Sequence, residues 1–460
     1  MGDVTVIGGG LAGCEAAYRV ARLGGKATLY EMKPRRFSPA HKLDGLAELV
    51  CSNSLKSVSL ENSSGLLKEE MRRLGSIVVE AAEATSVPAG KALAVDREAF
   101  SAYITKALTD AGVELRREEV TALPPSRPLV IATGPLTSDG LAAELKGFLG
   151  SGNLYFYDAI APIIYKDSIN FDVAFMGSRY GKGGDDYVNC PMTGEEYHSF
   201  VEELTGAERV ALRAFEKIPF FEGCMPVETM ADRGLKTLSF GPMKPVGFTD
   251  PRTGRRPAAI VQLRRENSAD SLYNMVGFQT RLTHPEQKRV FSLIPGLERA
   301  SFARLGSIHR NSYIDSPNLL LPTLQLKGEP SVFFAGQLTG VEGYCESAVS
   351  GIIAGINAWK LSSGREPVFP PPVTMTGALL RYITEPVAGK GAFQPMNANF
   401  GLLSRWGRGE GGKGGEERKK GKEREKGKNG KERKRKAKEE AVERALSGLS
   451  AWMDDAGNCK

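Results

Sequence analysis

Two cysteines stand in stretches where a thiol could take part in a reaction. Cys51 runs into three polar residues in AELVCSNSLKS, and Cys224 lies between the turn-forming residues Gly223 and Pro226 in EGCMPVE. A core cysteine normally has apolar neighbours, and a metal-binding cysteine has a second ligand two to four residues away. Neither holds for Cys51, so one interpretation is a reactive thiol. The alternative, for Cys51 and for Cys224, is a small packing residue. No metal site is predicted.

The other cysteines give no disulfide pattern. The six cysteines lie at positions 14, 51, 190, 224, 345 and 459, without a CxxC pair or a regular spacing. This usage fits a reduced, cytoplasmic protein. The first residues run directly into a strand pattern instead of a secretory signal, and no apolar run reaches the roughly 18 residues of a membrane span.

A phosphate-binding pattern opens the chain. Glycines 8, 10 and 13 form GxGxxG between a β-branched run and a helix-period segment, and Glu31 ends the next predicted strand. Such glycines allow a tight turn and a close approach to a pyrophosphate, which then faces the positive end of the helix dipole. Glu31 can accept hydrogen bonds from a ribose. The turn residues expected to contact a dinucleotide are Gly8, Gly9, Gly10, Leu11, Ala12 and Gly13; a merely tight βα turn is the alternative.

Two later stretches favour FAD over NAD as the tightly bound dinucleotide. RPLVIATGP (127–135) and FFAGQLTGVEGYCESAVSGIIAG (333–355) have the form of late elements in FAD domains of the glutathione-reductase type. In the second stretch a glycine turn and a helix N-terminus would approach the flavin. We expect FAD contacts at Gly134, Gly336, Gln337 and Tyr344, and NADH or NADPH as a transient reductant.

These elements predict an α/β protein with a Rossmann-like FAD-binding domain and an inserted mixed α/β domain. Amphipathic helices are expected at 61–75 and 96–112. Residues 405–438 hold 16 Lys/Arg against six Glu, a net of +10 in a chain whose total is +7. A segment so poor in apolar residues should be disordered. The predicted organisation is 1–155 and 321–404 for the FAD domain, 156–320 for the inserted domain, 405–436 for a disordered basic segment and 437–460 for a C-terminal helix.

Several longer strings resemble one family. VIGGGLAGCEAA, LAELVCSNSLKS, FEGCMPVETMADRG, GSIHRNSYI, FAGQLTGVEGYCESA and FQPMNANFGLL resemble the folate- and FAD-dependent tRNA (uracil-5-)-methyltransferases, or TrmFO, which are relatives of the GidA/MnmG flavoproteins. The resemblance covers residues 1 to about 403, and the basic segment departs from it. It implies methylation of a T-loop uridine in tRNA, usually position 54, with methylenetetrahydrofolate as the carbon donor and reduced flavin as the source of electrons.

The resemblance also implies two essential cysteines, which fall on Cys51 and Cys224. Addition of a thiolate to C6 of uracil makes C5 nucleophilic, and a base later removes the C5 proton. We assign Cys224 as the nucleophile and Cys51 as the second thiol, acting as a base or beside the flavin; the reverse order remains open. Substrate contacts are expected at His309, Asn311, Tyr313 and Arg281.

The partners follow from this interpretation: tRNA, folate and a nicotinamide cofactor, with no membrane contact and no prediction of oligomeric state. The basic segment is expected to attract RNA phosphates, with a solubilising linker as the alternative. Further candidate RNA contacts are Arg255, Arg256, Arg264 and Arg265, and Lys33, Arg35, Arg36 and Lys42. Two other functions compete, a flavoprotein that builds carboxymethylaminomethyl groups on wobble uridines and a non-catalytic RNA-binding flavoprotein.

Overall fold

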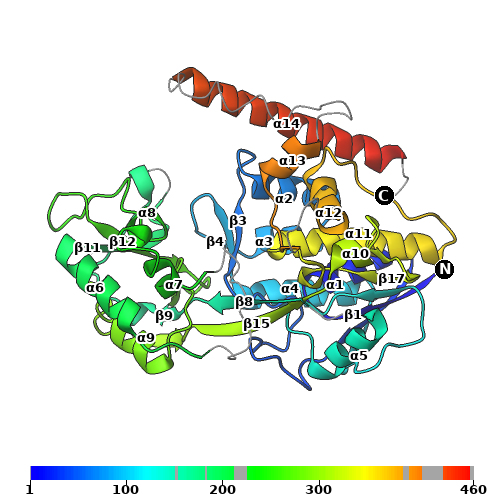
Figure 1. Ribbon diagram of the computed structural model, residues 1–460, viewed down its shortest axis with the longest axis horizontal. Coiled ribbons are helices and arrows are strands. Elements are labelled where there is room, and N and C mark those ends of the chain that lie inside the picture. The colour runs from blue at the N-terminus through cyan, green and yellow to red at the C-terminus, as the bar shows by residue number, and fades with distance from the viewer. Residues whose placement is uncertain are drawn as a thin grey trace.

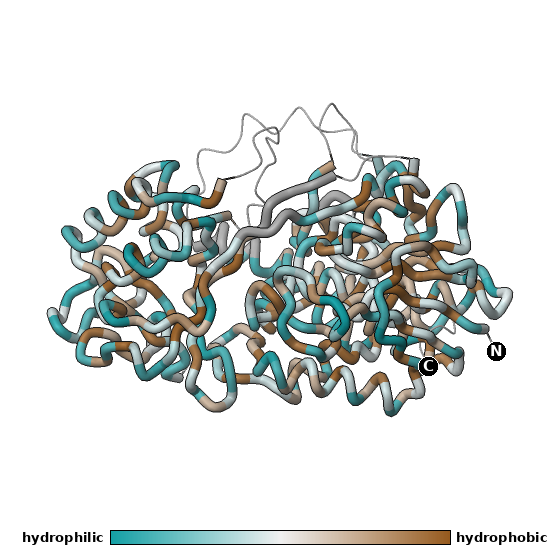
Figure 2. Tube along the Cα trace, turned by 90° about the horizontal axis from the view of Figure 1, so that it is seen from below, coloured by the Kyte–Doolittle hydropathy of each residue, from teal (hydrophilic) through white to brown (hydrophobic). Residues whose placement is uncertain are grey.

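The computed structural model describes residues 2–150, 154–181, 184–211, 225–386, 393–406 and 428–455 (Figure 1). It describes the backbone alone at 154–158, 308–310, 404–406, 428–431 and 433–434. The chain forms two lobes, joined by the antiparallel pair β8 (Leu154–Ile160) and β15 (Ser307–Tyr313). Figure 2 shows both lobes from below, with hydrophobic segments running through the interior of each.

The larger lobe is built on a six-stranded sheet in the order β16-β17-β7-β1-β2-β6. Its parallel strands are β1 (Asp3–Ile7), β2 (Lys26–Glu31), β6 (Glu114–Arg117), β7 (Leu129–Ile131) and β17 (Glu329–Phe334). The short β16 (Gln325–Leu326) pairs with β17 in the antiparallel direction. The predicted order of strand, glycine turn, helix and strand is therefore confirmed, and the buried strand predicted within 127–135 is β7.

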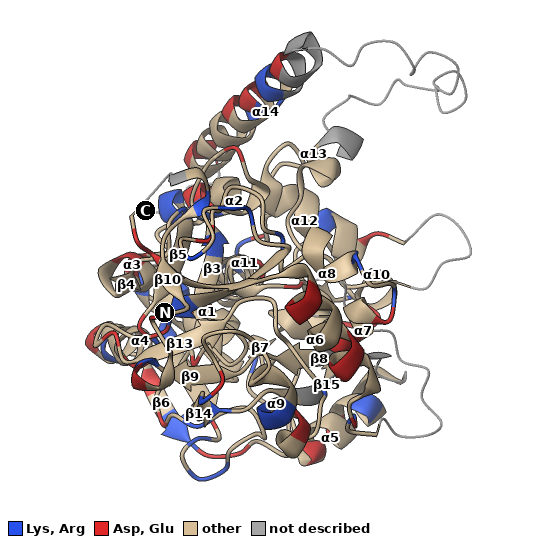
Figure 3. Ribbon diagram, turned by 90° about the vertical axis from the view of Figure 1, so that its left-hand side faces the viewer, with Lys and Arg blue, Asp and Glu red and all other residues tan. Residues whose placement is uncertain are grey.

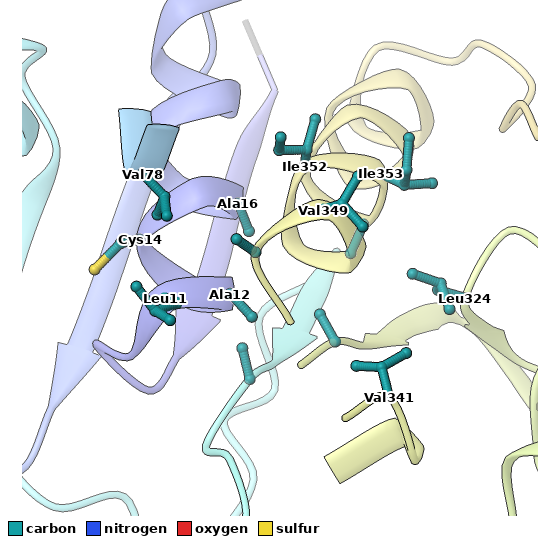
Figure 4. Packing of buried hydrophobic residues seen from close by; sticks show 14 of the residues in the cluster. Leu11, Ala12, Cys14, Ala16, Val78, Leu324, Val341, Val349, Ile352 and Ile353 are labelled. Carbon is teal, nitrogen blue, oxygen red and sulfur yellow. The ribbon is translucent and has the colours of Figure 1, made fainter. Parts of the chain in front are cut away.

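Two helices that follow strands of this sheet pack closely against each other. α1 (Leu11–Arg22) follows β1, and α11 (Tyr344–Ser362) follows β17 (Figure 4). A Cβ atom at Gly351 of α11 would lie 2.1 Å from the Ala12 carbonyl oxygen, so only glycine permits this approach. Because β1 and β17 run in the same direction, both helices begin at the carboxyl edge of the sheet, where ligands of such folds bind.

The rest of the larger lobe surrounds this core. α2 (Ser63–Arg73) and α4 (Arg97–Asp110) confirm the two amphipathic helices predicted at 61–75 and 96–112. A small sheet in the order β3-β5-β4 lies beside them, formed by β3 (Ser54–Ser57), β5 (Ala92–Val95) and β4 (Ser86–Val87). The remaining helices are α3 (Ile77–Ala84), α5 (Asp139–Leu149), the short 3-10 turn η4 (Gln337–Thr339), α10 (Ser316–Leu319), α12 (Met375–Thr384) and α13 (Phe400–Trp406).

The smaller lobe contains an antiparallel sheet in the order β10-β11-β12-β13-β9-β14. Its strands are β9 (Ile163–Tyr165), β10 (Phe175–Met176), β11 (Tyr187–Met192), β12 (Ala259–Arg265), β13 (Leu272–Met275) and β14 (Phe302–Arg304). Its helices are η1 (Lys166–Ser168), η2 (Arg179–Gly181), α6 (Gly194–Gly206), α7 (Val227–Ala231), α8 (Thr237–Phe240) and α9 (His284–Phe291).

The two lobes have separate hydrophobic cores among the described residues. The first core draws on residues from Val4 to Leu145 and from Tyr313 to Leu449, and the second on residues from Ile164 to Leu297. An inserted domain would produce this pattern, and the boundaries at 155 and 320 stay predictions. No helix in the described part of the chain is long and apolar enough to cross a membrane.

The C-terminal helix is longer than predicted. α14 runs from Lys428 to Asp455, so it begins within the segment predicted to be disordered, before the predicted helix at 437–460. Lys, Arg and Glu are good helix formers, and Arg435 pairs with Glu439 one turn later at 3.4 Å. The second half docks on the larger lobe through buried side chains such as Ala445 and Leu449, while the first half projects away from it (Figure 3). Residues 407–427 lie outside the described residues.

Candidate active site

The glycine turn after β1 has little room for side chains. Gly8 has φ +105°, and a Cβ there would lie 2.5 Å from the Ala132 carbonyl oxygen. A Cβ at Gly13 would lie 1.8 Å from the Gly8 carbonyl oxygen. At Gly10 a Cβ would meet nothing within 4 Å, and no side chain caps α1 there. The first N–H groups of α1 therefore face open space, as an anion-binding helix N-terminus requires.

Glu31, at the end of β2, holds the turn in place. Its carboxylate is 7% exposed and accepts hydrogen bonds from the backbone N–H of Gly9 at 2.9 Å and of Lys33 at 2.8 Å. A carboxylate has lone pairs beyond these two bonds. Glu31 can therefore position the glycine turn and still accept a bond from a ligand hydroxyl.

A cavity of about 1090 Å³ extends along the carboxyl edge of the larger sheet, and we call it the first cavity. Gly13 packs against the turn and does not line this cavity. All the other predicted cofactor contacts line it, namely Gly8, Gly9, Gly10, Leu11, Ala12, Glu31, Gly134, Gly336, Gln337 and Tyr344. It runs from the uncapped start of α1 to the start of α11, where Gly343 is also uncapped. Its volume, the open space at Gly10 and the two uncapped helix N-termini fit a dinucleotide such as FAD.

A second cavity of about 1270 Å³ adjoins the first and draws residues from both lobes. Val50, Pro135, Leu136, Gln337 and Tyr344 line both cavities. The side chains with chemical potential in the second cavity are Cys51, Lys56, Arg264, Asn274, Asn311, Glu342, Cys345 and Glu346. Among the described residues, the buried amide nitrogens of Asn274 and Asn311 and one carboxylate oxygen of Glu346 have no hydrogen-bond partner. Such buried orphan groups are rare in proteins and indicate a polar ligand.

Cys51 lies where the two cavities meet. Its backbone N–H donates to the Tyr344 hydroxyl oxygen at 2.9 Å, and the N–H of Ser52 donates to the same oxygen at 3.0 Å. The Cys51 Sγ atom is half-buried and 3.9 Å from the Ala159 carbonyl oxygen. Burial raises the pKa of Tyr344, so its side chain is a neutral phenol that fixes the backbone at Cys51.

Comparison with known proteins now identifies the family. The family model described as glucose inhibited division protein A, or GidA, matches residues 3–366. The protein named methylenetetrahydrofolate--tRNA-(uracil-5-)-methyltransferase TrmFO from Geobacter sulfurreducens is 58% identical over 98% of this chain and 99% of its own length. The protein of the same name from Pelobacter propionicus is 55% identical over 98% of this chain and 95% of its own. The chain belongs to the GidA family and, within it, to the TrmFO proteins.

The fold agrees with this membership. The structure of Aquifex aeolicus GidA in its form II crystal has a TM-score of 0.64 to this chain at 19% identity, and covers 84% of this chain and 68% of its own. The prediction of a flavoprotein α/β fold is confirmed. The TrmFO resemblance recognised from the sequence is confirmed as well.

The second thiol of the TrmFO resemblance, Cys224, lies outside the described residues, so its approach to Cys51 stays a prediction. The described chain resumes at Met225, and the N–H of Val227 donates to the carbonyl oxygen of Gln279 at 2.7 Å. Gln279 lines the second cavity. Glu228 is fully buried and accepts bonds from Thr280 Oγ1 and the Arg281 N–H, both at 2.9 Å, and burial raises its pKa.

The predicted substrate residues are only partly brought together. Asn311 lines the second cavity and is 2% exposed. Tyr313 lines neither cavity; its ring packs edge-on against Phe393 with a centroid distance of 5.9 Å. Arg281 also lines neither cavity, and its Nε lies 4.0 Å from Glu228 Oε1. His309 belongs to β15, where it pairs with Asp158, and its side chain is outside the described part of the structure.

The predicted basic patches are partly buried within the fold. Arg264 is buried and bonds to the Cys51 loop, whereas its neighbour Arg265 pairs with Asp270 at 2.8 Å. Lys33 is buried against Glu48. The patches are wrong for these buried arginine and lysine residues, because neighbours in a strand point to opposite faces and a charge count ignores this. The candidates that remain exposed are Arg35, Arg36, Lys42, Arg255 and Arg256, with Arg36 paired to Glu119.

Sequence reasoning missed several residues around the second cavity. Asn274 comes from β13 of the smaller lobe, and Arg97 and Arg304 hold the loop before Cys51. Lys56 has a positive φ of 66° and pairs with the buried Glu346 at 3.1 Å. Nothing in the local sequence marks these residues, because Arg97, Lys56 and Glu346 meet through the folding of the larger lobe, and Asn274 and Arg304 arrive from the smaller lobe.

Proposed function

We propose that this protein methylates C5 of a uracil in the T-loop of tRNA, at position 54. Methylenetetrahydrofolate would provide the carbon, and FAD reduced by NADH or NADPH the electrons. The observation that carries the proposal is the junction of the two cavities, where Tyr344 lines both and binds the backbone of Cys51. A thiol at this point is within reach of a cofactor in one cavity and a substrate in the other. A tRNA substrate also assigns the reaction to the cytoplasm.

The first cavity would hold FAD. The uncapped start of α1, at Gly10, would face the pyrophosphate, and Glu31, which accepts the Gly9 N–H, would accept a further bond from a ribose hydroxyl. Gly336 and Gln337 would lie against the ring system, with Tyr344 closing the boundary to the second cavity. When bound, reduced FAD supplies the hydride that turns the transferred methylene into a methyl group.

The second cavity would hold the two substrates in contact with the thiols. Cys224 would add to C6 of the uracil, and Cys51 would accept the C5 proton or act beside the flavin; the reverse assignment stays open. The reaction breaks the C5–H bond, forms a C5–CH₃ bond and releases tetrahydrofolate. The thiolate then leaves C6, so no sulfur is consumed.

The orphan amides would orient the reacting rings. Asn274 and Asn311 each have a buried N–H₂ group without a partner among the described residues. Carbonyl oxygens and ring nitrogens of a pyrimidine or a pterin are the acceptors that such donors need. Leaving either donor unpaired costs about 1–3 kcal/mol, so a ligand that satisfies both would gain affinity and orientation.

The decisive experiment combines the purified protein with an unmodified tRNA transcript, methylenetetrahydrofolate and NADH or NADPH, and measures nucleosides by mass spectrometry. Ribothymidine at position 54 is expected, and a transcript with cytidine at that position is the matched control. A carboxymethylaminomethyl group on a wobble uridine would favour the sister enzyme class. Yellow protein without any modified base would favour a non-catalytic flavoprotein, and either result would overturn the proposal.

A further inference from the structure

Three arginine residues from three separate elements converge on the loop that carries Cys51. They are Arg97 at the start of α4, Arg264 in β12 and Arg304 at the end of β14, and we call them the arginine clamp. Each guanidinium donates to a close neighbour of Cys51: Arg97 Nη1 to Leu49 O, Arg304 Nη2 to Val50 O at 2.7 Å, and Arg264 Nη2 to Ser52 Oγ at 2.6 Å and Nε to Asn53 Oδ1 at 3.0 Å.

The clamp joins the two lobes at the thiol. Arg97 and the loop belong to the larger lobe, whereas β12 and β14 belong to the sheet of the smaller lobe. Arg264 lines the second cavity together with Cys51. The loop is thus held from both sides, and Cys51 is the only ionisable side chain among residues 49–53.

The charges in the clamp do not balance. Arg97 pairs with Glu266, and these two side chains are only 11% and 4% exposed. The hydrogen-bond partners of Arg264 and Arg304 in the described structure are all neutral, namely a carbonyl, a hydroxyl and a side-chain amide oxygen. Burial lowers the pKa of both guanidinium groups, and Glu266, which already pairs with Arg97, is the one carboxylate that opposes this effect.

The other charged groups of the second cavity have partners of their own. Glu346 pairs with Lys56 and also accepts the Ala398 N–H at 3.1 Å. Glu342 accepts a bond from Gln337 at 2.7 Å. Both carboxylates lie at the start of α11, whose N-terminus stabilises negative charge. Among the ionisable side chains that line the second cavity, Cys51 is the one that belongs to the loop held by the clamp.

We propose that Arg264 and Arg304 are positioning residues whose positive charge holds Cys51 as a reactive thiolate at the junction of the cavities. A nearby cation favours the thiolate, as at other reactive cysteines. In turn, a negative Cys51 would favour the charged form of Arg304 and offset the effect of its burial. The use of this thiolate in methylation rests on the proposed function, but the reactivity of the thiol does not.

The alternative is that the clamp only ties the lobes together. A pair of substitutions separates the two roles. Arg304→Gln keeps an amide donor for the Val50 carbonyl without the charge, and Arg304→Lys keeps the charge with a different donor geometry. The same two substitutions are made at Arg264, so that the test can still be read at one position if the variants at the other position do not fold.

The assay is alkylation of Cys51 by iodoacetamide at pH 7 in the full-length protein with FAD bound, followed by peptide mass spectrometry. We expect the Gln variants to react about tenfold more slowly than wild type, and the Lys variants to stay within about threefold of it. The matched control is Arg127→Gln, because Arg127 also donates to backbone carbonyls, of Pro124 and Ser126, but lines neither cavity. FAD absorbance and thermal unfolding report folding.

A measurement on the wild-type protein needs no variant. Iodoacetate is negatively charged, so excess positive charge near Cys51 should raise its rate relative to iodoacetamide severalfold above the ratio for free cysteine. A ratio equal to that of free cysteine, or equal rates for the Gln and Lys variants, would overturn the inference. If the proposed function failed instead, no ribothymidine would form while the alkylation differences remained.

Discussion

Replacement of Tyr344 by phenylalanine tests the junction most directly. The Tyr344 hydroxyl oxygen accepts the N–H groups of Cys51 at 2.9 Å and Ser52 at 3.0 Å. Phenylalanine keeps the ring and its packing but removes the acceptor of both bonds. The loop would then carry two N–H groups without their partner, beside a thiol that must be held in place.

The size of the effect follows from these two bonds. An unsatisfied buried N–H costs about 1–3 kcal/mol. The loop is only half-buried and borders a cavity, so water can replace part of the loss and the lower end applies. Two groups at about 1 kcal/mol each give about 2 kcal/mol, or about a 30-fold lower rate if the loop must adopt this position to react.

The assay is single-turnover formation of ribothymidine with saturating tRNA and methylenetetrahydrofolate. The matched control is Tyr197→Phe, because Tyr197 in the smaller lobe also bridges backbone groups, donating to the Leu235 carbonyl oxygen at 2.5 Å and accepting the Ser239 N–H at 3.2 Å. This control should lose stability but not rate. A wild-type rate for Tyr344→Phe would refute the argument, and so would loss of FAD, which would assign the hydroxyl to cofactor binding.

Three further outcomes are expected. Cys51→Ser should retain FAD, seen by absorbance, but lose turnover, whereas retained ribothymidine formation would reject its role. Burial raises the pKa of Glu15 from 4.5 to about 7, so the folded state holds this proton at pH values where the unfolded chain has lost it. The free energy of unfolding should therefore fall by up to about 3 kcal/mol as pH rises between these two values. Urea unfolding at pH 5 and 8 should therefore show a smaller drop for Glu15→Gln and an unchanged drop for the exposed control Glu98→Gln. In tRNA binding, Arg435→Gln with Lys436→Gln should reduce the slope of log affinity against log salt by about 1–2, and an unchanged slope would remove α14 from the interface.

Much of the larger lobe could be predicted from local patterns. The GxGxxG turn, the strand ending at Glu31 and the two amphipathic helices all appear where the periodicity indicated. The basic segment was predicted less well, because helix propensity and the Arg435–Glu439 pair extend α14 to Lys428 against the expectation from composition. Composition measures whether a segment can bury apolar surface, and it ignores the local bonds that a charged helix makes for itself.

The candidate site was predicted only in part. Gly8 and Glu31 act within about 30 residues of each other, so a turn and a strand register were enough to find them. The charged sequence neighbours of Arg264 predict an RNA contact, yet β12 turns this side chain inward to Ser52 of the other lobe. Tyr313 sits near Asn311 in the sequence, but it packs against Phe393 outside the cavities.

The amino-acid sequence by itself determined the family and the glycine turn, and it singled out Cys51 as a candidate thiol, because each is encoded in a short run of residues. Only the tertiary structure decided what surrounds that thiol. Tyr344 is 293 residues away along the chain and Arg264 is 211 residues from Asn53, yet both bond to the same loop. The folding of the larger lobe brings Tyr344 to the loop, whereas Arg264 reaches it because the two lobes, each with its own core, meet at one edge. No local pattern in the sequence records either contact.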